Sequence, residues 1–452
     1  MMFTKQAGLK TWSDIWLPVL IFMGAFVIYV LCPVTTSTDS RWTLYLSMSM
    51  LHEQDADLDE YAGLMEERDY RVVYLNDHIY SYFPPGVPLA MVPYVWAVDT
   101  IYPLRYSTDF ATYLLEHFPD ETTGKIEKVA ASLMAALCAV LMYLVARVAL
   151  GGHSALLLVF IFTFSTSMLS TASRALWQHG PSALCLTAVL WVTLSQREGP
   201  KWMFFAGLLL GFSYVIRPTN SISIVALSLF MLLNRRKTFT SYFLGLSIPL
   251  IFLVLHSMQV YGMILPPYYL PQRLGTNSHF LEALAGHLIS PNRGLFIASP
   301  VLLFVFAGIY LQTKNGKFAL CNIDPYLAAI LILHWVVISS FEFWHGGWSL
   351  GPRFFTDVIP YMTYFLIPVL DHQNLWTSRL WKTVFAFTLL AGLFVHFRYA
   401  TSAYPMMWNQ KPVIIIDSPE RIWSWTDLQA LRGMCRDKLE GAAPGCWFSG
   451  DP

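Results

Sequence analysis

Charged residues are scarce in this chain of 452 residues: only 13% are Asp, Glu, Lys or Arg, while 55% are hydrophobic. That balance excludes an ordinary soluble globular protein, in which about a quarter of the residues are charged. The net charge is zero and no basic stripe is present, so we expect no nucleic-acid partner. The chain also lacks the phosphate-binding patterns GxxxxGK[ST] and GxGxxG, which argues against a cytosolic nucleotide as substrate. Its six cysteines include no CxxC pair and no Cys/His zinc spacing.

The chain instead consists largely of apolar runs of about 14 to 20 residues, roughly the length that crosses a bilayer. The sequence therefore predicts an all-α, polytopic membrane protein. We expect about eleven transmembrane helices, near residues 15–33, 126–148, 154–171, 180–196, 202–218, 221–234, 241–260, 295–312, 324–341, 354–370 and 380–397.

The segment 83–103 is a twelfth apolar run, but it has four prolines in its first eleven residues and is interrupted by Asp99. Short cytoplasmic loops carry an excess of Lys and Arg. If 83–103 does not cross the membrane, every basic turn, including Arg235-Arg236-Lys237, faces the cytoplasm; if it crosses, all of them face outward. We therefore predict that 83–103 lies in the outer interface as a juxtamembrane helix.

This topology predicts a transmembrane domain over 1–400 and a non-cytoplasmic C-terminal tail over 401–452. The domain carries a long first outer loop, 34–125, with juxtamembrane helices, and a second outer loop, 261–294. Because the tail would lie in a compartment that permits oxidation, we predict a disulfide between Cys435 and Cys446, with two free thiols as the alternative.

The first outer loop contains an acidic run in which Asp55-x-Asp57-x-Asp59 is followed by Glu66. The spacing imitates a calcium-binding loop, but Glu60 stands where such a loop requires glycine. A solvated acidic face is the better interpretation. A divalent metal held by fewer of these carboxylates stays open.

Asp39, in the stretch Thr35-Thr36-Ser37-Thr38-Asp39-Ser40-Arg41-Trp42, follows the outer end of the first span. An ionisable residue near a membrane span often has a function, although Asp is also a favoured N-cap for a helix beginning at Ser40. A functional role for Asp39 is favoured by the positions of other polar residues. Other polar residues that are unusual in such a chain also fall at the outer span ends: Arg174, His179, Arg217, Arg293, Arg353 and Asp357. The active face is therefore predicted to be outward.

An enzyme acting on that face needs an activated group that is carried by a lipid, and a polyprenyl-phosphate sugar fits. Because phosphate leaves as a stable anion, the reaction needs one base for the acceptor hydroxyl and cations for the phosphate. Asp39 is the predicted base, and the predicted cations are Arg353, Arg293, Arg217 and Arg174. For each arginine, anchoring in the interface is the alternative. Further candidates for substrate or metal contact are His179, Asp357, His345 and Trp348.

Four short stretches resemble the GT-C glycosyltransferases: Thr38 to Leu46, Asn76 to Leu89, Ser290 to Leu295 and Gly346 to Arg353. They are similar to the group of protein O-mannosyltransferases and lipid A aminoarabinose transferases. The resemblance implies an inverting transfer of sugar and places Asp39 at the family's catalytic acidic position. The family's second acidic residue is replaced here by Gln178-His179, which leaves the use of a metal open.

We therefore predict a membrane glycosyltransferase that moves a sugar from a polyprenyl-phosphate donor to a lipid, glycan or protein acceptor. We place it in a bacterial inner (plasma) membrane, with its active site facing the periplasm or exterior. A divalent metal is the one cofactor left open. The alternative is a transporter or flippase of a lipid-linked sugar, but such proteins tend to show repeats and polar residues at the bilayer midplane.

Overall fold

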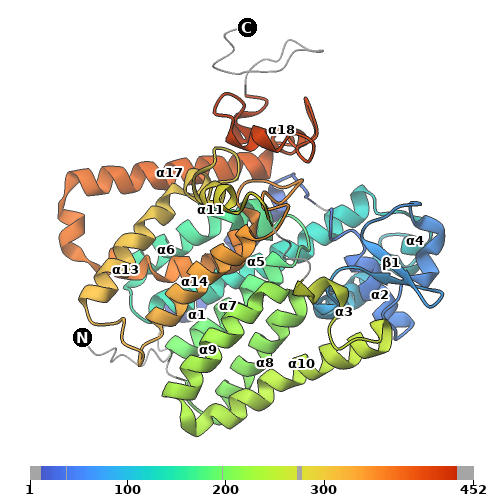
Figure 1. The fold of residues 1–452 in the computed structure, drawn as a ribbon, viewed down its shortest axis with the longest axis horizontal. Helices are drawn as coiled ribbons and strands as arrows, with labels where there is room; N and C mark the ends of the chain where they lie inside the picture. The colour runs from blue at the N-terminus through green and yellow to red at the C-terminus, as the bar shows by residue number, and fades with distance from the viewer. Residues whose placement is uncertain (1–11, 37, 196, 272–276, 435–452) are drawn as a thin grey trace.

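The fold is known from a computed structural model, which describes residues 12–36, 38–195, 197–271 and 277–434. Figure 1 shows a body of long helices, with a lobe containing α2, β1, α3 and α4 at one end and the segment around α18 above it. The predicted all-α class is confirmed, with one addition. The described residues include a hairpin of two short strands.

Each predicted span is helical in the structure. Eight of them are single helices: α1 (Trp12–Leu31), α5 (Glu121–Arg147), α7 (His179–Leu194), α8 (Pro200–Ile216), α9 (Ser221–Asn234), α10 (Phe239–Tyr261), α14 (Asp324–Ser339) and α17 (Arg379–Thr401).

The other three predicted spans are broken into shorter pieces. They are α6 (Gly152–Phe164) with the π-helical segment η3 (Met168–Ala172); α12 (Leu295–Ala298), η8 (Pro300–Leu303) and α13 (Phe304–Lys314); and η9 (Arg353–Val358), α15 (Ile359–Tyr364) and α16 (Ile367–Asp371). Proline accounts for breaks in the last two, because Pro300, Pro360 and Pro368 have no backbone N–H for a helix interior and each stands in the first turn of a new piece.

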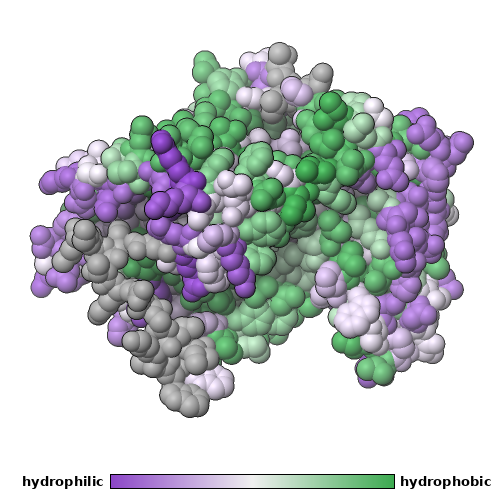
Figure 2. Space-filling view, turned by 90° about the horizontal axis from the view of Figure 1, so that it is seen from below, coloured by the Kyte–Doolittle hydropathy of each residue, from purple (hydrophilic) through white to green (hydrophobic). Residues whose placement is uncertain are grey.

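Four helical segments are long and apolar enough to cross a membrane, judged by length and composition: Gly86–Leu104, Glu121–Arg147, Arg236–Tyr261 and Arg379–Thr401. Three of these correspond to predicted spans, and Gly86–Leu104 is the segment predicted to lie in the interface. Seven of the other eight predicted spans contain shorter apolar helices, whereas 354–370 consists of pieces of 5 or 6 residues. Figure 2 shows apolar surface across the middle of the molecule and hydrophilic surface gathered towards its two ends, as expected of an integral membrane protein. The number of helices that cross stays a prediction.

The first predicted outer loop folds into a lobe, here called the loop lobe (residues 38–120). It contains α2 (Thr43–His52), η1 (Asp59–Leu64), β1 (Val72–Leu75), β2 (His78–Ser81), α3 (Gly86–Ile101), η2 (Tyr102–Leu104) and α4 (Phe110–Glu116). The strands are antiparallel, with Val72 opposite Ser81. Their two-residue turn needs positive φ at Asn76 and Asp77, 52° and 66°, and Asn and Asp tolerate this conformation better than most residues.

The helix α3 is the disputed segment 83–103. It packs against α2 and α4, and its buried residues Val87, Met91 and Val95 belong to the apolar core of the loop lobe. Its first residue, Gly86, lies so close to the last turn of α8 that a Cβ there would come within 2.6 Å of the backbone of Val215 and Ile216. The juxtamembrane placement stays a prediction, because by length and composition Gly86–Leu104 is also long and apolar enough to cross a membrane.

The topology predicts that a cysteine at position 236 is labelled by an impermeant thiol reagent only after the membrane is opened. A cysteine at position 77, in the hairpin turn, should be labelled from outside. The reason is the basic cluster of Arg235, Arg236 and Lys237, which the positive-inside rule keeps in the cytoplasm. Labelling of position 236 in intact cells would put 83–103 across the bilayer and reverse the assignment of the active face.

The second predicted outer loop contains η6 (Pro267–Tyr269) and α11 (Phe280–Ile289), and the tail contains α18 (Tyr404–Met407), η11 (Pro419–Trp423) and η12 (Gln429–Leu431). Tail and loop share a small buried cluster, to which Trp408, Ile415 and Ile422 contribute from the tail, and Ala283 and Trp344 from the loops. The predicted disulfide of Cys435 and Cys446 lies outside the described residues.

Candidate active site

Asp39 does not cap the helix that follows it. The helix α2 begins at Thr43, and Trp42 occupies the N-cap position. The Asp39 carboxylate instead accepts a hydrogen bond from the Tyr70 hydroxyl at 2.9 Å, and its other oxygen lies 3.5 Å from Nη1 of Arg353. The Asp39 side chain is 31% exposed, so a hydroxyl group of a substrate could approach it.

Arg353 begins η9 and lies between two aromatic rings. Its guanidinium carbon is 4.3 Å from the ring centroid of Trp177 and 5.0 Å from that of Phe354. The Nε atom is buried and has no hydrogen-bond partner among the described residues. Aromatic faces can hold a cation while leaving its N–H donors uncommitted. The Nε–H of Arg353 is therefore a donor that an anion beside Asp39 could use.

Arg217, just after α8, belongs to a second charged group that includes Asp357 of η9 and His179 of α7. Arg217 Nε lies 2.6 Å from one Asp357 oxygen, and His179 Nδ1 lies 3.2 Å from the other. All three side chains are buried. Arg217 also lies against the Phe354 ring, 5.8 Å from its centroid, so Arg217 and Arg353 both contact this ring. Asp357 offsets the charge of Arg217 at 2.6 Å. The carboxylate that faces Arg353 among the described residues is Asp39, at the longer distance of 3.5 Å.

Arg174 is fully buried and its guanidinium binds the end of α1. It donates to the carbonyl oxygen of Cys32 at 2.9 Å, to that of Tyr29, and to the Ser173 hydroxyl at 3.1 Å. A cation is favourable at this position because the last carbonyls of a helix are unsatisfied and carry partial negative charge. This geometry favours a structural role over phosphate binding.

Arg293 is also committed to the protein. Its five N–H donors reach the carbonyls of Asn292, His345 and Gly347 and the side chains of Asn409 and Gln429. The contact to Gln429 is 2.5 Å and that to Asn409 is 2.6 Å. Arg293 therefore connects the C-terminal tail, through hydrogen bonds, to the loop that leads to Arg353. Of the four predicted phosphate ligands, Arg353 is best placed, with Arg217 next.

His345 and Trp348 lie in that same loop, between α14 and η9. His345 is buried, and its Nδ1 accepts a hydrogen bond from the Gly347 N–H at 3.2 Å. Trp348 packs against the cluster shared by tail and loops. The loop turns at Gly346, Gly347 and Gly351, where φ is 78°, 57° and 56°. Only glycine adopts such angles freely, which explains the glycines of the stretch from Gly346 to Arg353.

Several residues that shape the site were not predicted for these roles. Tyr70 precedes the hairpin and has no sequence pattern that links it to Asp39. Trp177 stands three positions after Arg174, but the cation on its ring is Arg353, so no local pattern links the two residues. Gln429 of the tail accepts from the Gly351 N–H at 3.2 Å and so helps to fix the approach to Arg353.

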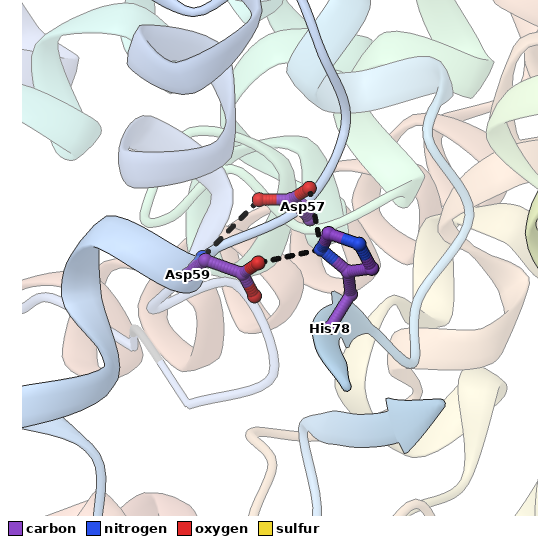
Figure 3. Close-up of side chains that lie close together, drawn as sticks. All are labelled: Asp57, Asp59 and His78. Carbon is purple, nitrogen blue, oxygen red and sulfur yellow. Dashed lines mark hydrogen bonds and ion pairs between the residues drawn. The ribbon is translucent and has the colours of Figure 1, made fainter. Parts of the chain in front are cut away.

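Among the residues that the structure describes, three side chains of the loop lobe could hold a metal, two from the acidic run and one from β2. Figure 3 shows Asp57, Asp59 and His78, whose ligand atoms lie within 4.8 Å of one another. His78 Nδ1 is 2.6 Å from Asp59 and 3.4 Å from Asp57. The hydrogen bond with Asp59 raises the pKa of His78, so a protonated imidazole would stabilise the same arrangement without a metal. Metal use therefore stays open.

Glu60 makes the loop lobe sensitive to pH. Burial raises the pKa of Glu60 to about 7, and one of its oxygens is buried without a hydrogen-bond partner among the described residues. The folded lobe therefore favours the protonated acid. Its contribution to stability is fully present below the unfolded-state pKa of about 4.3 and is lost as the pH rises through about 7.

We expect hydrogen exchange in residues 57–82, corrected for intrinsic rates, to be faster at pH 8 than at pH 5. Glu60→Gln should remove the part of this difference that is due to Glu60, because the amide does not ionise, and should leave the part due to the His78–Asp59 ion pair, which is also lost as the pH rises. Glu67→Gln, at an exposed position of the same loop, is the control and should keep the whole difference. Equal protection at both pH values in the parent protein would contradict the prediction.

The comparisons with known proteins agree with this fold. Residues 126–261 match the family model described as dolichyl-phosphate-mannose-protein mannosyltransferase. The crystal structure of ArnT from Cupriavidus metallidurans, bound to undecaprenyl phosphate, is 15% identical with a TM-score of 0.50, covering 88% of this chain and 65% of that one. The apo oligosaccharyltransferase of Archaeoglobus fulgidus is 12% identical with a TM-score of 0.50, covering 96% and 62%.

No curated protein matches the chain. The chain spans slightly less than two thirds of the length of each of the two solved proteins. At these identities the likeness concerns the fold, and it confirms the resemblance predicted from the four short stretches.

Proposed function

We propose that this chain, whose fold is that of the GT-C glycosyltransferases, transfers a sugar from a polyprenyl phosphate to a hydroxyl-bearing acceptor on the non-cytoplasmic face of a membrane. The observation that carries the proposal is the pair of Asp39 and Arg353. A partly exposed carboxylate faces a guanidinium whose Nε has no partner among the described residues. Undecaprenyl phosphate in the ArnT structure supports a lipid phosphate as the donor group.

In the proposed reaction, Asp39 accepts the proton of the acceptor hydroxyl as that oxygen attacks the anomeric carbon. The bond between the anomeric carbon and the phosphate oxygen breaks, and the polyprenyl phosphate leaves as an anion. Arg353 offers N–H donors to the phosphate as its charge grows. Arg217 also lies against the Phe354 ring and is the second candidate, although its charge is offset by Asp357. One direct displacement inverts the anomeric carbon.

Tyr70 supports Asp39 in this scheme. Tyr70 is 61% exposed, but desolvation of its hydroxyl where it meets the Asp39 carboxylate, together with the charge of that carboxylate, raises the pKa of Tyr70. The Tyr70 hydroxyl donates to one Asp39 oxygen, and the other faces Arg353. These two contacts orient the Asp39 carboxylate.

The proposal is tested by adding the purified protein to vesicles that contain polyprenyl-phosphate sugars, with mass spectrometry of the lipid, glycan and protein fractions. We expect release of polyprenyl phosphate together with a glycosylated product whose anomeric configuration is inverted. The same analysis of cell envelopes with and without the chain identifies the acceptor. If labelled lipid-linked sugar changed leaflet but was never transferred, the transporter alternative would replace the proposal.

A further inference from the structure

Glu127, on the second turn of α5, is an acid in an unusual place. Only 3% of it is exposed. Its Oε1 atom accepts hydrogen bonds from the Ser40 hydroxyl and from the Leu176 backbone N–H, the latter at 2.7 Å. Burying a carboxylate is costly unless its hydrogen bonds are met. Glu127 is therefore bound firmly by two segments that are far apart in the sequence.

Each partner of Glu127 is the neighbour of a site residue. Ser40 follows Asp39, and Leu176 precedes Trp177, the ring on which Arg353 lies. The Trp177 indole N–H in turn donates to the Thr36 carbonyl at 2.9 Å. The Oε1 atom of Glu127 thus links the segment that contains Asp39 to Trp177, the residue on whose ring Arg353 lies.

The next residue of α5 extends this arrangement. Lys128 Nζ donates to the Cys32 carbonyl at 3.0 Å, at the start of the segment that leads to Asp39. Adjacent residues of one long helix therefore bind the segment near both of its ends, at Cys32 and Ser40. Because α5 is a rigid helix, it sets where the segment lies relative to Trp177.

We propose that Glu127 is a positioning residue that fixes the spacing of Asp39 and Arg353 for transfer. The inference rests on the proposed function. Glu127 is too deeply buried to meet a substrate, so its effect on the site must pass through the residues that it contacts, Ser40 and Leu176 among them. Misplacement by about 1 Å can cost about 100-fold in rate, so loss of this carboxylate should act on turnover rather than on donor binding.

The test compares Glu127→Ala, Glu127→Gln and Ser40→Ala. We expect Glu127→Ala to lower kcat about 100-fold with little change in KM for the lipid-linked donor. Glu127→Gln keeps an acceptor oxygen and should recover most of the rate. Ser40→Ala, which removes one donor only, should lower kcat less, and its effect should not add to that of Glu127→Ala.

Asp324→Ala is the matched control. Asp324 is equally buried and accepts from the Tyr364 hydroxyl at 3.1 Å, but it begins α14, at the predicted cytoplasmic end. Its loss should lower the melting temperature and leave kcat per folded molecule unchanged. If Glu127→Ala and Asp324→Ala changed only the amount of folded protein, Glu127 would be structural and the inference would fail.

Hydrogen exchange separates this inference from the proposed function. Glu127→Ala should speed exchange in residues 38–42 and 175–178, and Glu127→Gln should do so much less, whether or not the parent transfers sugar. If the parent transferred no sugar but these segments loosened, the function would fail and the structural link would stand. If the parent transferred sugar and neither exchange nor kcat changed in Glu127→Ala, the inference alone would be overturned.

Discussion

Replacing Asp39 by Asn is expected to lower the rate of sugar transfer about 10²–10⁴-fold, the usual cost of removing a general base. The protein should still fold and insert. The amide has the size of the carboxylate and its oxygen can still accept the hydrogen bond from Tyr70, but it cannot take a proton from an acceptor hydroxyl. The measurement is the rate of product formation per folded molecule in vesicles with a polyprenyl-phosphate sugar.

The structure removes the main competing explanation of such a result. A lost N-cap would cost about 1 kcal/mol of stability, but α2 begins at Thr43 with Trp42 at its N-cap. Asp77→Asn is the matched control, because it makes the same chemical change at an exposed loop position where Asn tolerates the positive φ of 66°. It should transfer sugar at the parental rate. Parental activity in Asp39→Asn would require the base to be sought elsewhere.

Length and apolarity were enough to locate the apolar helices, because crossing a bilayer demands an apolar run of about 20 residues. The breaks within two of the predicted spans were not anticipated. Proline explains them at Pro300 and Pro360, although Pro249 lies inside the unbroken α10. The interior of the loop lobe was beyond such reasoning. Its hairpin and helices are short and are defined by packing against each other, so the sequence of this loop carries little periodic signal.

The roles of the four arginines could not be separated by sequence. Each stands at the end of an apolar run, so capping a helix, bracing a loop and binding an anion share the same local pattern. Contacts between distant segments decide among them. Arg174 meets carbonyls of α1, Arg293 meets the tail, and Arg353 meets Asp39 across 314 positions of sequence.

The role of Glu127 could not be predicted from the local sequence either. An acid in the first turns of an apolar helix is the ordinary composition of a helix start, where it complements the helix dipole. Nothing in the local sequence distinguishes it from the exposed Glu121 of the same helix, which pairs with Lys125. Only burial and the contacts to Ser40 and Leu176 reveal a different role.

Arg353→Lys is expected to lower transfer about 10²–10³-fold, the usual cost of losing a donor to the charge that develops in a transition state. Lysine keeps the charge but loses the planar fork that binds phosphate through two N–H groups and stacks between Trp177 and Phe354. Because phosphate is bound before and during the reaction, KM for the donor should rise and kcat should fall together. Steady-state kinetics with varied donor concentration measures both.

Arg421→Lys provides the matched control for this substitution. Arg421 also lies on a tryptophan, 4.4 Å from the Trp408 centroid, and pairs with Asp427 at 3.0 Å, but it belongs to the tail. The variant Arg421→Lys loses the same stacking and the same planar fork. Any general cost of replacing arginine by lysine should therefore appear in this variant as reduced stability with normal specific activity. If Arg353→Lys kept the parental kinetics while Arg217→Lys lost transfer, the donor phosphate would bind Arg217. Asp357 would then have to release its ion pair during the reaction.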